Sequence, residues 1–148
     1  MASFSATVDA WVRETKARQT AVFRESAQRI TEEILTPVAK GGHMRVETGF
    51  MRASLSASLE GALPQLADRP EAAVKATQET GAPSVTFDDS AVGLVISNAE
   101  IGDTITFAFA ASYARHVENK FAMVRLAAQR WPQVVAEVAK EAKGRAGG

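Results

Sequence analysis

The chain has 148 residues, 46% of them hydrophobic and 23% charged, which is typical of one globular domain with a real core. It has no cysteine, and this excludes disulfide bonds, thiolate nucleophiles and cysteine zinc sites. The 17 basic and 17 acidic side chains balance, which argues against tight binding of duplex DNA, because dedicated DNA-binding proteins usually carry a basic excess.

Charge is nonetheless distributed unevenly along the chain. Residues 61–114 carry two basic and seven acidic side chains, whereas residues 115–148 carry seven basic and three acidic ones. An acidic middle and a basic end could attract a neighbouring copy head to tail. The alternative interpretation is that both are ordinary solvated faces.

Neither a signal peptide nor a membrane span is predicted. Asp9 and Arg13 interrupt the region in which a signal peptide needs continuous apolar residues. The longest uncharged apolar stretch, residues 104–114, is far shorter than the roughly 20 residues that cross a bilayer as a helix. We therefore expect a soluble protein without a membrane partner, and the lack of cysteine is compatible with assembly in a reducing cytoplasm.

A long helix is predicted at residues 5–35. Its apolar and small side chains recur at three- and four-residue steps, which places them on one helix face. Pro37 and the pair Gly41 and Gly42 end the pattern. At about 1.5 Å per residue the helix is on the order of 45 Å long, more than a compact domain of this size needs. The stripe consists of Val8, Trp11, Val12, Thr15, Gln19, Val22, Phe23, Ser26, Ile30 and Ile34.

A strand and an insertion are predicted next. Leu55, Ala57 and Leu59 alternate with more polar residues, which indicates a strand with one buried face. Residues 61–84 hold three prolines and two glycines around a helix-favouring piece at 71–80. This composition predicts a loop-rich insertion.

A β-hairpin is predicted at residues 92–109. Apolar residues alternate on both sides of a turn at residues 98–103, as in two antiparallel strands that face a core. A short edge strand could form at residues 85–87. The alternating residues are Val92, Leu94 and Ile96 before the turn, and Ile105, Phe107 and Phe109 after it.

The last predicted element is a helix with a break. Pro132 lacks an N–H donor and crowds the preceding turn, so we expect a kink near residues 128–131, and a flexible tail at residues 144–148. The fold class is therefore α+β in a single domain, with a long N-terminal helix, a small antiparallel β-sheet and a C-terminal helix packed on the sheet. The last stripe is Phe121, Val124, Leu126, Ala127, Trp131, Val134, Val135 and Val138.

No catalytic, cofactor or metal site is predicted. His43 and His116 have no His, Cys or carboxylate at metal-ligand spacing. The adjacent pair Glu32 and Glu33 point in different directions on a helix, and the aspartates at 88–89 suit a turn. Neither a nucleophile elbow nor a phosphate-binding glycine loop is present. We therefore expect that the protein is not an enzyme.

A specific local pattern spans residues 46–55, Val-Glu-Thr-Gly-Phe-Met-Arg-Ala-Ser-Leu. Glu47 and Thr48 before Gly49 predict a hydrogen-bonded turn, in which glycine can take a conformation closed to other residues. Arg52 can then reach back to Glu47 or outward to a partner. Ser54 completes the predicted turn motif.

This pattern resembles the signature P-V-D-T-G-x-L-R-x-S of the phage head–tail joining family, which includes relatives of the lambda-like minor tail protein Z. Arg45 stands where the family has Pro, Glu47 where Asp is common, and Met51 where Leu is usual. The segment Tyr-Ala-Arg-His-Val-Glu at residues 113–118 matches the family's Tyr-Ala-x-x-Val-Glu before the C-terminal helix. The family's following Glu-x-Gly-Thr and Pro-Phe are reduced here to the single Phe121.

The resemblance implies a virion protein that forms a homo-oligomeric ring at the phage neck, assembled in the cytoplasm of the bacterial host. Its implied partners are copies of itself, head-completion (stopper) proteins, and tail terminator or tail tube proteins, with DNA passing through the channel without specific binding and with no cofactor. The candidate interface residues are Arg52, Tyr113, Arg115 and Glu118.

Two alternatives remain open. One is a tail terminator ring protein, which is also a small α/β ring subunit. The other is a non-viral soluble oligomeric binding module that uses the long amphipathic helix as a coiled-coil partner, although Gln19 and Ser26 weaken a strict heptad seam.

Overall fold

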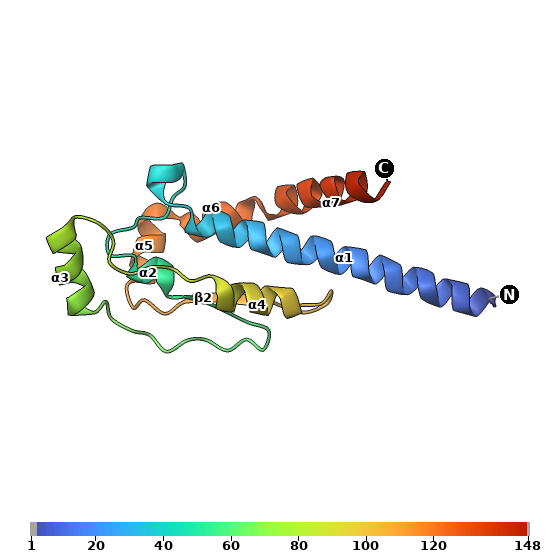
Figure 1. Ribbon diagram of the computed structural model, residues 1–148, viewed down its shortest axis with the longest axis horizontal. Coiled ribbons are helices and arrows are strands. Elements are labelled where there is room, and N and C mark those ends of the chain that lie inside the picture. Colours follow the sequence, from blue (N-terminus) through green and yellow to red (C-terminus); the bar gives the residue numbers. More distant parts are fainter. Residues whose placement is uncertain (1–2, 148) are drawn as a thin grey trace.

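The computed structural model describes residues 3–147, and the side chains of residues 3–145. It confirms the mixed α+β class: a long N-terminal helix comes first, a small antiparallel sheet lies in the middle and a helix ends the chain (Figure 1). The helices are α1 (Phe4–Leu35), α2 (Phe50–Ala53), α3 (Glu71–Thr80), α4 (Ser90–Asn98), α5 (Ala114–Phe121), α6 (Met123–Gln129) and α7 (Trp131–Gly147), with a 3₁₀ turn, η1 (Val38–Lys40), and the strands β1 (Leu55–Ser58) and β2 (Thr106–Phe109).

Helix α1 confirms the predicted long helix. It has 32 residues, and the Ser3 hydroxyl caps its first turn by accepting a hydrogen bond from the Ala6 N–H at 3.1 Å. Its buried residues, including Ile30 and Ile34, all lie in the C-terminal third. The N-terminal part of α1 extends beyond the rest of the molecule (Figure 1). Only the C-terminal part of the predicted stripe therefore faces the core of this chain.

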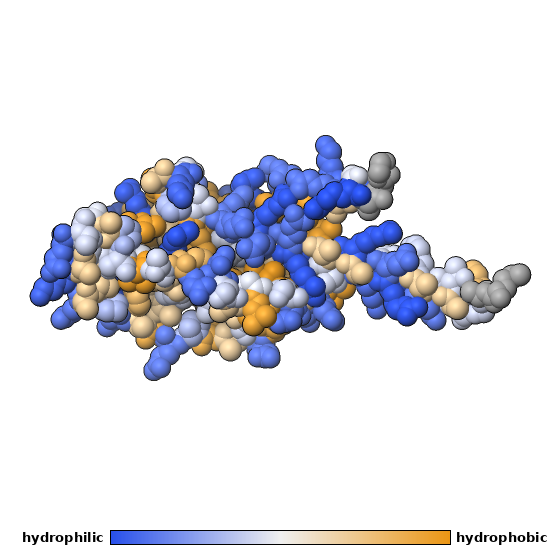
Figure 2. Space-filling model, in the orientation of Figure 1, coloured by the Kyte–Doolittle hydropathy of each residue, from blue (hydrophilic) through white to orange (hydrophobic). Residues whose placement is uncertain are grey.

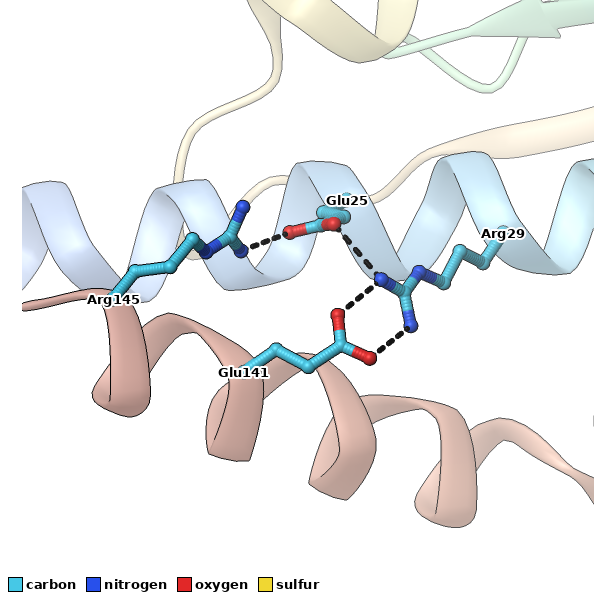
Figure 3. A network of polar contacts seen from close by, with 4 residues as sticks. All are labelled: Glu25, Arg29, Glu141 and Arg145. Atoms are coloured by element: carbon cyan, nitrogen blue, oxygen red, sulfur yellow. Dashed lines mark hydrogen bonds and ion pairs between the residues drawn. The ribbon is translucent and has the colours of Figure 1, made fainter.

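Helix α7 lies antiparallel along α1. Glu25 and Arg29 of α1 form a polar network with Glu141 and Arg145 of α7 (Figure 3). The break predicted near Pro132 is confirmed, because α6 ends at Gln129 and α7 begins at Trp131. The helix continues through Gly147, so residues 144–147 of the predicted tail are helical, and residue 148 lies outside the described residues.

The prediction of a hairpin at residues 92–109 was wrong. Residues 90–98 form α4, and β2 pairs instead with β1, antiparallel, with Leu55 opposite Phe109 and Ser58 opposite Thr106. Helix α4 packs against β1.

The alternation at residues 92–96 fits a helix because Val92 and Ile96 are one turn apart. Both are 3% exposed and pack with Ala27 of α1, whereas Leu94 is 63% exposed on the other side of α4. Asp88 starts the helix by accepting a hydrogen bond from the Ser90 N–H at 2.9 Å. The expected edge strand at residues 85–87 does not form either.

The core lies where α1, α6, α7 and the sheet meet. Its fully buried side chains include Met44, Met123, Val134 and Val138. Burial of such apolar side chains is the main favourable contribution to folding, at roughly 25 cal/mol per Å².

The insertion at residues 61–84 contains the predicted helix, since α3 spans Glu71–Thr80. Near the end of the sheet, the Ala67 N–H of the insertion donates to the Ala110 carbonyl at 2.8 Å and the Ser112 N–H donates to the Ala67 carbonyl at 2.9 Å. Over residues 3–147, none of the helices has both the length and the apolar character needed to cross a bilayer.

Candidate functional site

In the predicted turn at residues 47–49, Thr48 and Gly49 are buried, whereas Glu47 is exposed. Thr48 is 2% exposed, and its hydroxyl accepts a hydrogen bond from the Phe50 N–H at 3.1 Å, which starts α2. Gly49 has φ = 87°, in the left-handed region, and its carbonyl accepts from the Ala53 N–H at 3.0 Å. The glycine is required here because other residues pay a steric cost at this φ.

The same turn holds the end of the insertion. The Thr48 carbonyl accepts a hydrogen bond from the Val85 N–H at 2.9 Å. A Cβ atom at Gly49 would meet the Val85 carbonyl oxygen, so the backbone of residues 83–85 passes directly over the glycine.

Ser54 connects the turn motif to the sheet. Its hydroxyl donates to the Met51 carbonyl at 2.7 Å and accepts from the Ala111 N–H at 3.1 Å. Its carbonyl accepts from the Ala110 N–H at 3.0 Å, which extends the pairing of β1 with β2. The motif is therefore a junction between α2, the insertion and the end of β2.

Arg52 does not reach back to Glu47, as one interpretation of the sequence had it. Its Nε donates to the carbonyl of Leu35 at 3.0 Å, and its guanidinium lies 5.5 Å from the centre of the Phe87 ring. Glu47 pairs with Arg69 of the insertion at 3.0 Å instead. Arg52 thus joins the C-terminus of α1 to the motif, where a cation also interacts favourably with the helix dipole.

Tyr113 also makes contacts inside the chain. It is partly buried, with its ring 6.4 Å from that of Phe50 and the Arg69 guanidinium 5.3 Å from its ring centre. Burial raises the pKa of the Tyr113 hydroxyl above its ordinary value, and the charge of Arg69 opposes that rise.

Glu118 caps the next helix. Its two carboxylate oxygens accept hydrogen bonds from the backbone N–H groups of Val124 and Arg125, each at 2.9 Å. Ala122, between α5 and α6, has φ = 56°, and its N–H donates to the Glu118 carbonyl at 2.7 Å. Among the four candidate interface residues, Arg52, Tyr113 and Glu118 therefore have partners within the chain, whereas Arg115 is exposed, as is His116.

The N-terminal part of α1 carries an exposed apolar face, and the sequence indicated the long helix as a contact surface only in the alternative of a coiled-coil binding module. We call residues 4–15 of α1 the arm. Its apolar residues Phe4, Val8 and Trp11, at helical spacing, are 85%, 39% and 65% exposed. The available signal was the length of the helix, which exceeds what the domain can cover.

An apolar groove lies beside the base of the arm, between α1 and α7. It has a volume of about 830 Å³ and is lined by apolar side chains, with Arg18 and Lys143 as its charged residues. In the space-filling view, apolar side chains gather where the arm leaves the body (Figure 2). The main apolar lining residues are Val22, Phe23, Ile101, Trp131, Val135 and Ala139.

Several titratable side chains of the described residues form structural pairs. Within residues 3–147, no group of three or more His, Asp or Glu side chains could hold a metal ion. Hydrogen bonding to Arg29 lowers the pKa of Glu141, and hydrogen bonds from Ser90 lower that of Asp88. Both carboxylates hold helices in place.

Comparisons with protein-family models, with curated proteins and with solved structures find no match to this chain.

Proposed function

We propose that this chain is a structural subunit of a tailed-phage particle, at the neck where the tail is completed and joined to the head. Several copies form a ring around the DNA channel. One side of the ring contacts head-completion proteins and the other contacts tail terminator or tail tube proteins. The protein works by assembly and makes or breaks no covalent bond.

The observation that carries this proposal is the free apolar end of α1. Phe4 and Trp11 are more than half exposed, and burying a large aromatic side chain is worth on the order of 2 kcal/mol. An apolar face of this kind, on a helix that leaves the body of the domain, is typical of a surface that another chain covers. We therefore expect another chain to cover this face when the subunit assembles.

The phage identity is supported by the two segments that resemble the head–tail joining family. Thr48, Gly49 and Ser54 form the junction on which the insertion and the sheet meet, and Glu118 caps α6. Each of these motif residues therefore has a structural role in this chain. The balance of 17 basic and 17 acidic side chains suits a ring through which DNA slides, since a strongly basic lining would hold the phosphates.

Native mass spectrometry and electron microscopy of the purified full chain, alone and mixed with phage tail tubes, test this function. A neck protein forms rings in solution, or binds as a ring at the end of the tube. A tail terminator also forms such a ring but blocks further tube growth, which a tube-length measurement detects. A stable monomer or dimer that does not bind tail tubes would support the non-viral binding module and overturn the proposal.

A further inference from the structure

We infer that the arm of one copy docks into the groove between α1 and α7 of the next copy. This contact joins two different surfaces of the same chain, so it is heterologous and generates a ring when the rotation between copies closes. The inference names the subunit contact of the ring and in that respect rests on the proposed function.

The two surfaces match in length and spacing. The arm spans 12 residues and the stretch of α7 that lines the groove, 131–143, spans 13, so each is about 18–20 Å long. Phe4, Val8 and Trp11 follow steps of four and three residues along the arm. Val135, Ala139 and Ala142 follow the same steps along α7.

The two surfaces also match in side-chain size. The arm carries two large aromatic residues, whereas α7 lines the groove with two small ones, Ala139, which is exposed, and Ala142, which is half-buried. Large residues of one helix pack into the spaces that small residues leave on another. The groove volume of about 830 Å³ is ample for aromatic side chains.

The charges beside these surfaces are complementary. Asp9 follows Val8 in the arm but lies about 100° further round the helix, away from the face formed by Phe4 and Trp11, and Lys143 lies at the edge of the groove. Both are exposed, and neither has an ion-pair partner among the side chains of residues 3–145. An unpaired acid on the arm and an unpaired base at the groove attract each other at longer range, which favours the approach of the arm to the groove.

A second copy is favoured as the occupant because the chain's own arm cannot fill its own groove. The arm is the straight continuation of α1, which forms one wall of the groove, and it points away from the body (Figure 1). The matching surface must therefore come from another molecule, and each copy supplies one arm and one groove.

Cross-linking of full-length chains tests the contact, because the native sequence has no cysteine. One chain carries Val8→Cys and the other Ala139→Cys, both at exposed positions, so the fold should be kept. On mild oxidation we expect a disulfide-linked pair of chains to form about tenfold faster than in the control mixture, because docking raises the effective concentration of the thiols. The control pairs Val8→Cys with Leu94→Cys, an exposed site on α4.

Three further substitutions sharpen the test. Adding Trp11→Ala to the Val8→Cys chain should slow the cross-link, and Asp9→Lys should slow it in a way that Lys143→Glu on the other chain reverses. Fast cross-linking of Val8→Cys with itself would instead mean that arms pair with arms, and would overturn the inference.

The outcomes separate this inference from the proposed function. Rings on tail tubes together with a cross-linking rate equal to the control would remove the arm–groove contact and leave the neck function standing. Fast arm–groove cross-linking in a protein that never binds tubes would leave the contact standing and remove the neck function.

Discussion

Gly49 and Val85 approach so closely that a Cβ atom at Gly49 would clash with the Val85 carbonyl oxygen. This contact fixes where the insertion returns to the body of the domain. Two separate constraints meet at Gly49, since its φ of 87° is unfavourable for other residues and the space for a side chain is already taken by backbone.

The variant Gly49→Ala should therefore lower the free energy of unfolding by about 3 kcal/mol or more, combining left-handed strain with a backbone clash. Gly81→Ala is the matched control, because Gly81 has φ = 73° with nothing within 4 Å of an added Cβ. It should cost about 1 kcal/mol. Urea unfolding of both variants measures the difference, and equal losses would show that residues 83–85 simply move aside.

Arg52→Ala should destabilise the isolated chain by about 1–2 kcal/mol, because it removes a charged hydrogen bond to the Leu35 carbonyl and the contact with the Phe87 ring. Arg115→Ala, at an exposed arginine, should change the stability by less than about 0.5 kcal/mol. Denaturant unfolding compares the two. An Arg52→Ala variant that is as stable as the wild type but fails to assemble would restore the interpretation of Arg52 as an interface residue.

Glu118→Ala should cost about 1–2 kcal/mol, since two N–H groups at the start of α6 lose their acceptor. Glu118→Gln, which keeps one acceptor oxygen, should lose less. Glu79→Ala on α3, an exposed glutamate, serves as the control and should be nearly neutral. Thermal unfolding followed by circular dichroism ranks the stabilities of the three variants. A Glu118→Gln variant as unstable as Glu118→Ala would argue against capping of α6 by Glu118.

Acid should weaken the attachment of α7 to α1. The hydrogen bond from Arg29 lowers the pKa of Glu141 below its usual 4.5. A lowered folded-state pKa contributes stability above the unfolded-state value, and this contribution is lost as pH falls through the folded-state pKa. The Tm difference between wild type and Glu141→Gln should therefore be present at neutral pH and shrink below about pH 4.5.

The control for the pH experiment is Glu79→Gln, whose Tm difference from wild type should not vary with pH in this way. Taking differences is necessary because the lowered pKa of Asp88 gives the wild type and both variants a further acid dependence of the same sign. A Glu141→Gln difference that stays constant into acid would contradict the role of the Arg29–Glu141 pair.

The elements that sequence patterns predicted well are those set by local residues. The limits of α1, the helix at 71–80 and the break before Pro132 follow from helical periodicity, proline and glycine, and all three are confirmed. The turn at Gly49 was predictable for the same reason.

The assignment of residues 92–96 failed because a short apolar segment fits both periods. Val92 and Ile96 lie on the same side of a strand and on the same side of a helix, and only packing against Ala27 of α1 decides between them. Likewise, the partner of Arg52 is Leu35, which is distant in sequence, and the partners of Glu118 lie across the break between α5 and α6. The structural roles of both residues could therefore not be read from neighbouring residues.

The pairing of the first strand with the second has a consequence for how the chain folds. The Ser56 hydroxyl bonds to the Ala108 carbonyl across 52 residues, and Arg145 bonds to Glu25 across 120. Such a high contact order slows folding, because long loops must close before these contacts form. During synthesis the ribosome must release α7 before the core can close, so chains that stop before Trp131 would be targets for chaperones or proteases.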